Sequence, residues 1–132
     1  MMKTIIIDTN AFLAISTFNL DIFEAVDHVC DFPYCLAIVE GTIAELEKIK
    51  TDKMQKGKDK LAAKLGLQIL KQKIANKEIT VMKDDSTVSV DDNLVFESEQ
   101  GALVLTQDKG LKDRLTPPYL TIRQKKKIVF VE

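Results

Sequence analysis

The sequence predicts an α/β protein: a three-layer α/β/α sandwich around a central, mainly parallel sheet. Short apolar runs alternate with segments of helical periodicity along almost the whole chain, a pattern typical of parallel strands joined by helices. The first run, residues 5–7, consists of three isoleucines, as expected for a central strand that is buried on both faces. The 132 residues show no repeat or linker, so we expect a single domain over residues 1–132.

The first elements follow from this opening strand. Apolar residues recur at helical spacing over 11–18, and Thr9 or Asn10 can cap this helix, with Asn10 the preferred cap. A second helix is expected over 22–29. A second buried strand is expected over 35–39, after a break at Phe32-Pro33.

The middle of the chain is expected to hold two helices separated by a lysine-rich segment at 53–60. Thr42 and Glu45 form a capping-box pattern, in which Thr42 caps a helix that continues to Lys50. The next helix is expected over 61–75, with an apolar stripe made of Leu61, Leu65, Ile69 and Leu70.

The last third of the chain continues the alternation and ends in two consecutive strands. A strand at 78–82 precedes a polar loop and a helix that starts at Asp91-Asp92 and ends near Gly101. The elements expected after it are, in order, a strand at 102–105, a short helix from 108 to about 115, and strands at 119–122 and 128–131.

Composition excludes several classes of protein. The formal net charge is only −1, so binding to nucleic acid would depend on local lysine clusters rather than on overall charge. Cys30, Cys35 and the single histidine, His28, are too few for a zinc site; the two cysteines either form one disulfide or, as we favour, stay free in a reducing compartment. Neither a signal-peptide core nor a membrane-spanning run is found, so we expect a cytoplasmic protein without membrane contact.

Acidic residues recur where predicted strands end and predicted helices begin. Asp8 directly follows the first strand and Asp108 follows the strand at 102–105, so both are expected at the same edge of a parallel sheet. Glu45 and the pair Asp91-Asp92 lie in first helical turns, which face that edge when helices follow parallel strands. The sequence therefore predicts that up to four acidic groups converge on one crevice.

Such a cluster of acids calls for a cation. Two carboxylates about 4 Å apart repel each other by roughly 4 kcal/mol at an effective dielectric near 20. Oxygen ligands without histidine or cysteine nearby suit Mg²⁺ or Mn²⁺. Each acid also has a structural alternative: Asp8 as a helix cap, one of Asp91 and Asp92 as a cap, Glu45 or Glu47 as a solvated helix edge, and Asp108 as a turn residue.

Four short motifs occur in order: Ile-Asp-Thr-Asn at 7–10, Thr-Ile-Ala-Glu-Leu at 42–46, Asp-Asp-Asn-Leu-Val at 91–95 and Leu-Val-Leu-Thr-Gln-Asp at 103–108. Together they resemble the PIN-domain family of metal-dependent ribonucleases, over nearly the full chain. The lysine-rich insert after the second motif is similar to that of archaeal members related to the eukaryotic rRNA-processing PIN nucleases. VapC-type toxins share the same motifs.

The resemblance implies a PIN-like fold and assigns catalytic and metal-binding roles to Asp8, Glu45, Asp92 and Asp108. It favours Asp92 over Asp91, because Asp92 stands two positions before Leu94 in the motif. Asn10 and Thr106 match polar residues that accompany the site. Many relatives carry a further aspartate two residues after the fourth acid, where this chain has Gly110, which implies a weaker or absent second metal position.

The activity implied by the resemblance is hydrolysis of RNA phosphodiester bonds by an endoribonuclease that uses Mg²⁺ or Mn²⁺, with rRNA processing as its setting. The alternatives are a VapC-type toxin controlled by a protein antitoxin, and a non-catalytic module that binds RNA or protein. The partners implied are RNA, a second copy of the chain, and an antitoxin or a ribosome-assembly protein. Phosphotransfer folds are disfavoured, since haloacid-dehalogenase-like enzymes need an acid where Asn10 stands and receiver domains need an acidic pair after the first strand.

An acidic pocket repels RNA, so basic side chains are needed nearby. The candidates for phosphate contacts are Lys48, Lys53, Lys56, Lys58, Lys60 and Lys109. The alternative is that these lysines serve only to keep the surface soluble.

Overall fold

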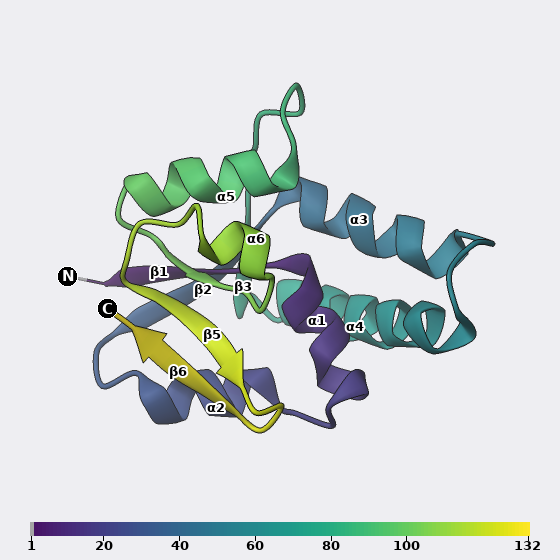
Figure 1. The fold of residues 1–132 in the computed structure, drawn as a ribbon, viewed down its shortest axis with the longest axis horizontal. Coiled ribbons are helices and arrows are strands. Elements are labelled where there is room, and N and C mark those ends of the chain that lie inside the picture. Colours follow the sequence, from purple (N-terminus) through teal and green to yellow (C-terminus); the bar gives the residue numbers. More distant parts are fainter. Residues whose placement is uncertain (1) are drawn as a thin grey trace.

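The computed structural model describes residues 2–132, and within them it forms a six-stranded sheet with the strand order β3-β2-β1-β4-β5-β6 (Figure 1). Neighbouring strands are parallel except β5 and β6, which are antiparallel. The mainly parallel sheet predicted from the alternation of elements is therefore confirmed. The strands are β1 (Lys3–Ile7), β2 (Tyr34–Val39), β3 (Ile79–Met82), β4 (Leu103–Leu105), β5 (Tyr119–Arg123) and β6 (Lys127–Val131).

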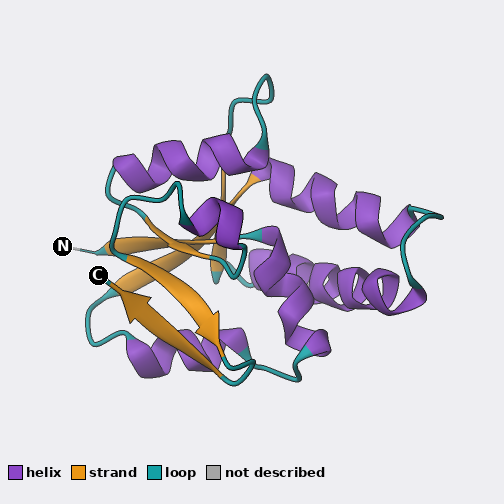
Figure 2. Cartoon of the chain, in the orientation of Figure 1, coloured by secondary structure: helices purple, strands orange, loops and turns teal. Residues whose placement is uncertain are grey.

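Helices cover both faces of the sheet and complete three layers (Figure 2). Ile5 and Ile7 of β1 pack on one side, in the larger apolar core, while Ile6 between them packs in the core on the other side. This alternation explains why all three isoleucines are fully buried. The larger core is covered by α1 (Thr9–Thr17), α2 (Ile22–Val29), α3 (Glu40–Thr51) and α4 (Gly57–Ala75), and the smaller one by α5 (Val90–Glu99) and α6 (Lys109–Lys112).

The cap of α1 differs from the expectation. Asp8, and not Asn10, is the N-cap, because helix geometry begins at Thr9 and the Asp8 carboxylate accepts the hydrogen bond of the Thr9 N–H at 2.8 Å. Asn10 lies inside the first turn of the helix, where its side chain turns toward the end of β4. The strand therefore passes into α1 without a connecting loop, which places Asp8 directly at the sheet edge.

The predicted capping box of α3 is wrong. The helix begins two residues earlier, at Glu40, after an N-cap at Val39 that makes no side-chain hydrogen bond. Thr42 is consequently inside the helix and fully buried, and its hydroxyl has no hydrogen-bond partner among the described residues. Glu45 is then free to point out of the helix toward α1.

The buried face of α4 also differs from the predicted stripe. Leu70 is buried, but Leu61 and Leu65 are 56% and 36% exposed. The helix instead packs through its small residues and Leu67, and a Cβ at Gly66 would lie 2.9 Å from the carbonyl oxygen of Phe12 in α1. Because α1 and α4 approach closely, α4 buries the face that carries its small residues and leaves Leu61 and Leu65 toward the surface.

The remaining elements fall close to their expected positions. Helix α6 is shorter than expected and ends at Lys112, ahead of the Pro117-Pro118 break. The two central residues of the β5–β6 turn, Gln124 and Lys125, have φ of 57° and 58°, which matches the right-handed twist of a hairpin. Both cysteines are free thiols. Within residues 2–132, no helix is long and apolar enough to cross a membrane.

Candidate active site

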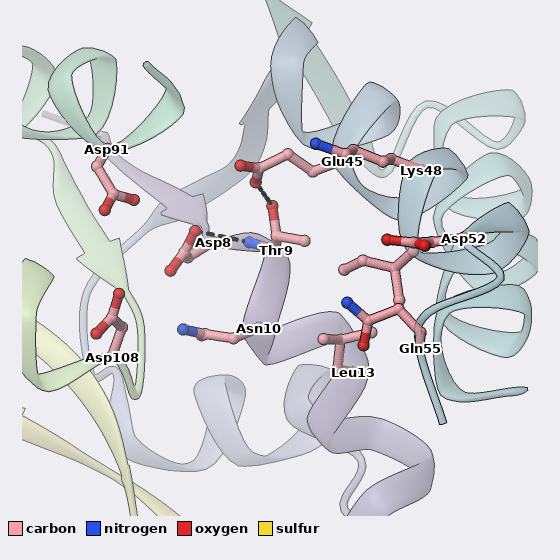
Figure 3. A pocket seen from close by; sticks show the side chains of 11 residues that line it. Asp8, Thr9, Asn10, Leu13, Glu45, Lys48, Asp52, Gln55, Asp91 and Asp108 are labelled. Atoms are coloured by element: carbon pink, nitrogen blue, oxygen red, sulfur yellow. Dashed lines mark hydrogen bonds between the residues drawn. The ribbon is translucent and has the colours of Figure 1, made fainter. Parts of the chain in front are cut away.

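A pocket of about 500 Å³ opens beside the carboxyl ends of β1 and β4 (Figure 3). Five carboxylates line it. Four lie where the sequence predicted candidate acids: Asp8 after β1, Glu45 in α3, Asp91 in the first turn of α5, and Asp108 before α6; the fifth, Asp52, directly follows α3. They meet because β1 and β4 are parallel neighbours, so the residues that follow both strands emerge at one edge of the sheet. Three of the acids singled out from the sequence, Asp8, Glu45 and Asp108, thus share one pocket.

Asp8 is the most deeply placed of these acids, with 4% of its surface exposed. Its Oδ1 accepts the Thr9 N–H at 2.8 Å, and its Oδ2 accepts the hydroxyl of Thr106 at 2.7 Å. Burial raises the pKa of Asp8 from 3.8 to about 6, against the opposing effect of these two hydrogen bonds, and the charges of Asp91 and Glu45 raise it further. The carboxylate is therefore held in a fixed position, in surroundings that disfavour its ionised form relative to water.

Thr106 connects the acids of β1 and β4. Its fully buried hydroxyl donates to Asp8 and accepts the backbone N–H of Asp108 at 3.0 Å. Asn10 lies next to it, with Nδ2 at 3.4 Å from the Thr106 hydroxyl and Oδ1 accepting the Gln107 N–H at 3.3 Å. The two residues expected to accompany the site therefore hold the end of β4 against the start of α1.

Glu45 and Glu47 point in different directions. Glu47 pairs with Lys50 at 3.3 Å and with Lys71 at 3.4 Å, away from the pocket. Glu45 lines the pocket and accepts a hydrogen bond from the Thr9 hydroxyl. Because the backbone N–H of Thr9 also binds Asp8, this threonine links two of the acids.

Asp92, which the motif favoured over Asp91 as the third acid, lies outside this pocket. Its Oδ1 accepts from Arg114 at 2.6 Å on the outer side of α5, and its pKa is lowered chiefly by that hydrogen bond. Asp91, one position earlier, faces the pocket instead. Burial is the main reason that the pKa of Asp91 is raised, and the charge of Asp108 is the next. The difference arises because successive residues of a helix point about 100° apart, so only one of the two can face the sheet edge.

The pocket acids form no ion pair within residues 2–132. The ion pairs of these residues involve Glu47, Glu78 and Asp92, and none involves the five pocket carboxylates. This donor set consists of oxygens alone, which suits a hard divalent cation. No three acidic, histidine or cysteine side chains of residues 2–132 are close enough together to hold one ion directly. Mg²⁺ commonly keeps several waters and takes only one or two protein carboxylates, so the pocket acids could hold such an ion only with water as part of its ligand set.

The candidate lysines occupy two places around the pocket. Lys48 lines the pocket itself, and Lys109 follows Asp108 at the start of α6. The others, Lys53, Lys56, Lys58 and Lys60, lie on the connection between α3 and α4 and on the first turn of α4, at the right of Figure 1.

Several residues that line the pocket were not predicted from the sequence. Asp52 and Gln55 come from the α3–α4 connection, which folds back so that both line the pocket. No periodicity or motif points to them, because an irregular segment carries no spacing rule. Leu13 of α1 and Ile49 of α3 supply apolar lining. Thr9, in contrast, carried a local signal, since it adjoins Asp8 at the strand end.

Comparison with known families agrees with this architecture. A family model described as a PIN like domain matches residues 5–125. The chain belongs to this PIN-like domain family, and the resemblance seen in its four motifs is confirmed.

Two relatives extend the comparison. The chain is 27% identical to Ribonuclease VapC4 of Methanocaldococcus jannaschii over 131 residues, which are 95% of this chain and 94% of that protein. Among solved structures, that of the PIN domain endonuclease Utp24 is similar with a TM-score of 0.74 at 25% sequence identity, and the match covers 96% of this chain and 90% of that one. Both likenesses extend over almost the whole described fold.

Proposed function

We propose that this protein is a Mg²⁺- or Mn²⁺-dependent endoribonuclease. The observation that carries the proposal is the convergence of Asp8, Glu45, Asp91 and Asp108 on one pocket, where none of them forms an ion pair within residues 2–132. Burying the charge of Asp8 among other carboxylates is unfavourable for folding, as its raised pKa indicates, and a functional role for the charge would account for this cost. The names of the two relatives, a ribonuclease and a PIN domain endonuclease, support the same reaction.

The reaction is hydrolysis of an RNA phosphodiester bond. Water oxygen bonds to phosphorus, the bond from phosphorus to the 3′ oxygen breaks, and a proton from the water ends on that oxygen, leaving a 5′-phosphate and a 3′-hydroxyl. A bound divalent ion supplies an activated water and offsets the charge that develops on the phosphoryl group.

Four of the pocket acids would hold the ion. Asp8 would be a direct ligand, because Thr9 and Thr106 hold its two oxygens in place. Glu45, Asp91 and Asp108 would complete the site directly or through water. The lysines of the α3–α4 connection attract the phosphates that the acids would otherwise repel.

The test compares neighbouring aspartates. A 5′-labelled structured RNA is incubated with Mn²⁺ and with wild type, Asp8→Asn, Asp91→Asn or Asp92→Asn protein. We expect Asp8→Asn and Asp91→Asn to lose more than about 100-fold in rate, since even an outer partner of a metal ligand is worth about 10- to 100-fold. Asp92→Asn, which removes the same charge one residue away, should lose less than about fivefold. Wild-type cleavage in the Asp8→Asn Asp91→Asn double variant, or cleavage unaffected by a chelator, would contradict the proposal.

A further inference from the structure

The pocket has a second half that the proposed hydrolysis does not use. Across from Asp91 and Asp108, the side chains of Asp52 and Gln55 point into the same space (Figure 3). Leu13 and Ile49 provide apolar lining next to them. An acidic side chain combined with apolar lining does not suit a phosphate, but it does suit a flat group that has hydrogen-bond donors on its edge.

The size of the pocket is adequate for such a group. Its volume of about 500 Å³ lies in the range of about 300–1,000 Å³ that is usual for small-molecule sites. A nucleotide whose phosphate reaches the acids can therefore place its base against Leu13 and Ile49. Lys48 lines the same pocket and is available for the phosphate.

Asp52 is held in a defined orientation. It follows the last residue of α3, and its Oδ1 accepts the backbone N–H of Met54 at 2.8 Å. This hydrogen bond holds Oδ1 of a residue that lines the pocket, and it leaves Oδ2 and the second lone pair of Oδ1 available to accept further hydrogen bonds. The carboxylate makes no ion pair within residues 2–132.

We infer that this half of the pocket binds a guanine base of the RNA strand, next to the bond that is cleaved. The inference rests on the proposed function for its substrate and extends it to base preference. Guanine presents two adjacent donors, N1–H and the N2 amino group, which match the two oxygens of Asp52. Its O6 acceptor can take an N–H of the Gln55 amide. Adenine and cytosine place a ring acceptor beside one amino group, and uracil has a single N–H between two carbonyls, so none of them matches a carboxylate equally well.

The first experiment measures base binding without any catalysis. Isotope-labelled protein in a chelator is titrated with guanosine, adenosine, cytidine and uridine, and the amide NMR signals of residues 49–55 are followed. Guanosine is expected to bind roughly 5- to 150-fold more tightly than adenosine, the range that a good bidentate contact discriminates.

One substitution should exchange the preference. In Asp52→Asn, the side-chain oxygen can keep the Met54 contact and still accept a second hydrogen bond. The amide nitrogen beside it becomes a donor, so the side chain presents one acceptor and one donor. That pair matches the edges of adenine and of cytosine, so the variant is expected to favour adenosine and cytidine over guanosine. Asp59→Asn removes the same charge from the first turn of α4, outside the pocket, and should leave the order of affinities unchanged.

The second experiment determines which base lies beside each site at which the RNA is cleaved. Sequencing of the RNA ends is expected to show guanine enriched at one position beside the cut in wild type, and adenine or cytosine there in Asp52→Asn. Equal affinity for the four nucleosides, or an unchanged preference in Asp52→Asn, would overturn the guanine site even if RNA is cleaved. Guanosine binding without any metal-dependent cleavage would instead contradict the proposed nuclease function, so the two failures are distinguishable.

Discussion

Asp8 combines two tasks that conflict energetically. As the N-cap of α1 it satisfies a backbone N–H, and as the innermost pocket acid it carries a charge at a site that burial makes unfavourable. The rise of its pKa from 3.8 to about 6 corresponds to roughly 3 kcal/mol of destabilisation when the group is ionised in the native state. A cation bound at the site would offset this cost.

This conflict predicts that Asp8→Asn stabilises the metal-free protein at neutral pH. An asparagine can still cap α1 but carries no charge, while the altered hydrogen bond with Thr106 costs about 1 kcal/mol. We expect a net gain of about 2 kcal/mol at pH 7.5, measured by urea denaturation in a chelator. Asp113→Asn, which removes an exposed carboxylate, should change the stability by less than about 0.5 kcal/mol.

The same variant has a defined pH dependence. Native Asp8 keeps its proton up to about pH 6, whereas the unfolded chain loses it near 3.8, so wild type loses stability as the pH rises through this interval. Below about pH 4 the group is neutral in both states and the advantage of Asp8→Asn should disappear. An advantage that stayed constant from pH 4 to 7.5 would show that burial of the charge is not its cause.

At the scale of elements, the packing of α1 on α4 determines how the larger core closes. Gly66 allows α4 to approach the Phe12 carbonyl of α1, and Leu67 and Leu70 are buried on the same side of the helix. This packing leaves Leu61 and Leu65 toward the surface, although a helical wheel alone favours them as core residues. Close packing has overridden the apolar pattern.

A pair of glycine variants tests this packing. Gly66→Ala places a Cβ 2.9 Å from a backbone oxygen that cannot move without shifting α1, so we expect a loss of about 1–3 kcal/mol despite the better helix propensity of alanine. Gly57→Ala, at the start of the same helix, meets nothing within 4 Å and should be neutral or slightly stabilising. Thermal or urea denaturation measures both. Equal effects of the two changes would contradict the close approach.

At the scale of the whole molecule, charge is unevenly distributed. Acids gather at the carboxyl edge of the sheet, whereas Lys53, Lys56 and Lys58 lie on the α3–α4 connection and the start of α4. The formal net charge of −1 conceals this arrangement. A polyanion would then be attracted beside the pocket rather than by the pocket itself.

This arrangement predicts a salt-dependent contribution to RNA binding from one group of lysines. Replacing Lys53, Lys56 and Lys58 together by glutamine should weaken RNA binding and reduce the slope of log affinity against log salt by about 2, at roughly 0.7 to 0.9 for each phosphate that is no longer neutralised. The same replacement of Lys125, Lys126 and Lys127, at the β5–β6 turn, is the matched control and should leave the slope unchanged. Filter binding over a range of salt concentrations measures both. Equal slopes for the two triple variants would mean that the first group only solubilises the surface.

The sequence by itself determined the alternation of elements and the positions of most pocket acids. Both are local properties: apolar runs and helical spacing predict strands and helices, and Asp8 and Asp108 directly follow strands. Since parallel neighbouring strands end at one edge, their convergence followed as soon as the fold class was known. The PIN family resemblance came from the same residues.

Only the tertiary structure decided what depends on orientation. Whether Asp91 or Asp92 faces the pocket is set by the rotation of α5 against the sheet, and counting along a motif cannot show this. Which face of α4 is buried depends on how closely α1 approaches it. Whether Asp52 lines the pocket depends on how the irregular connection between α3 and α4 folds back. The physical reason is the same in each case: local patterns determine which element forms, whereas packing between distant segments determines which side of it faces inward.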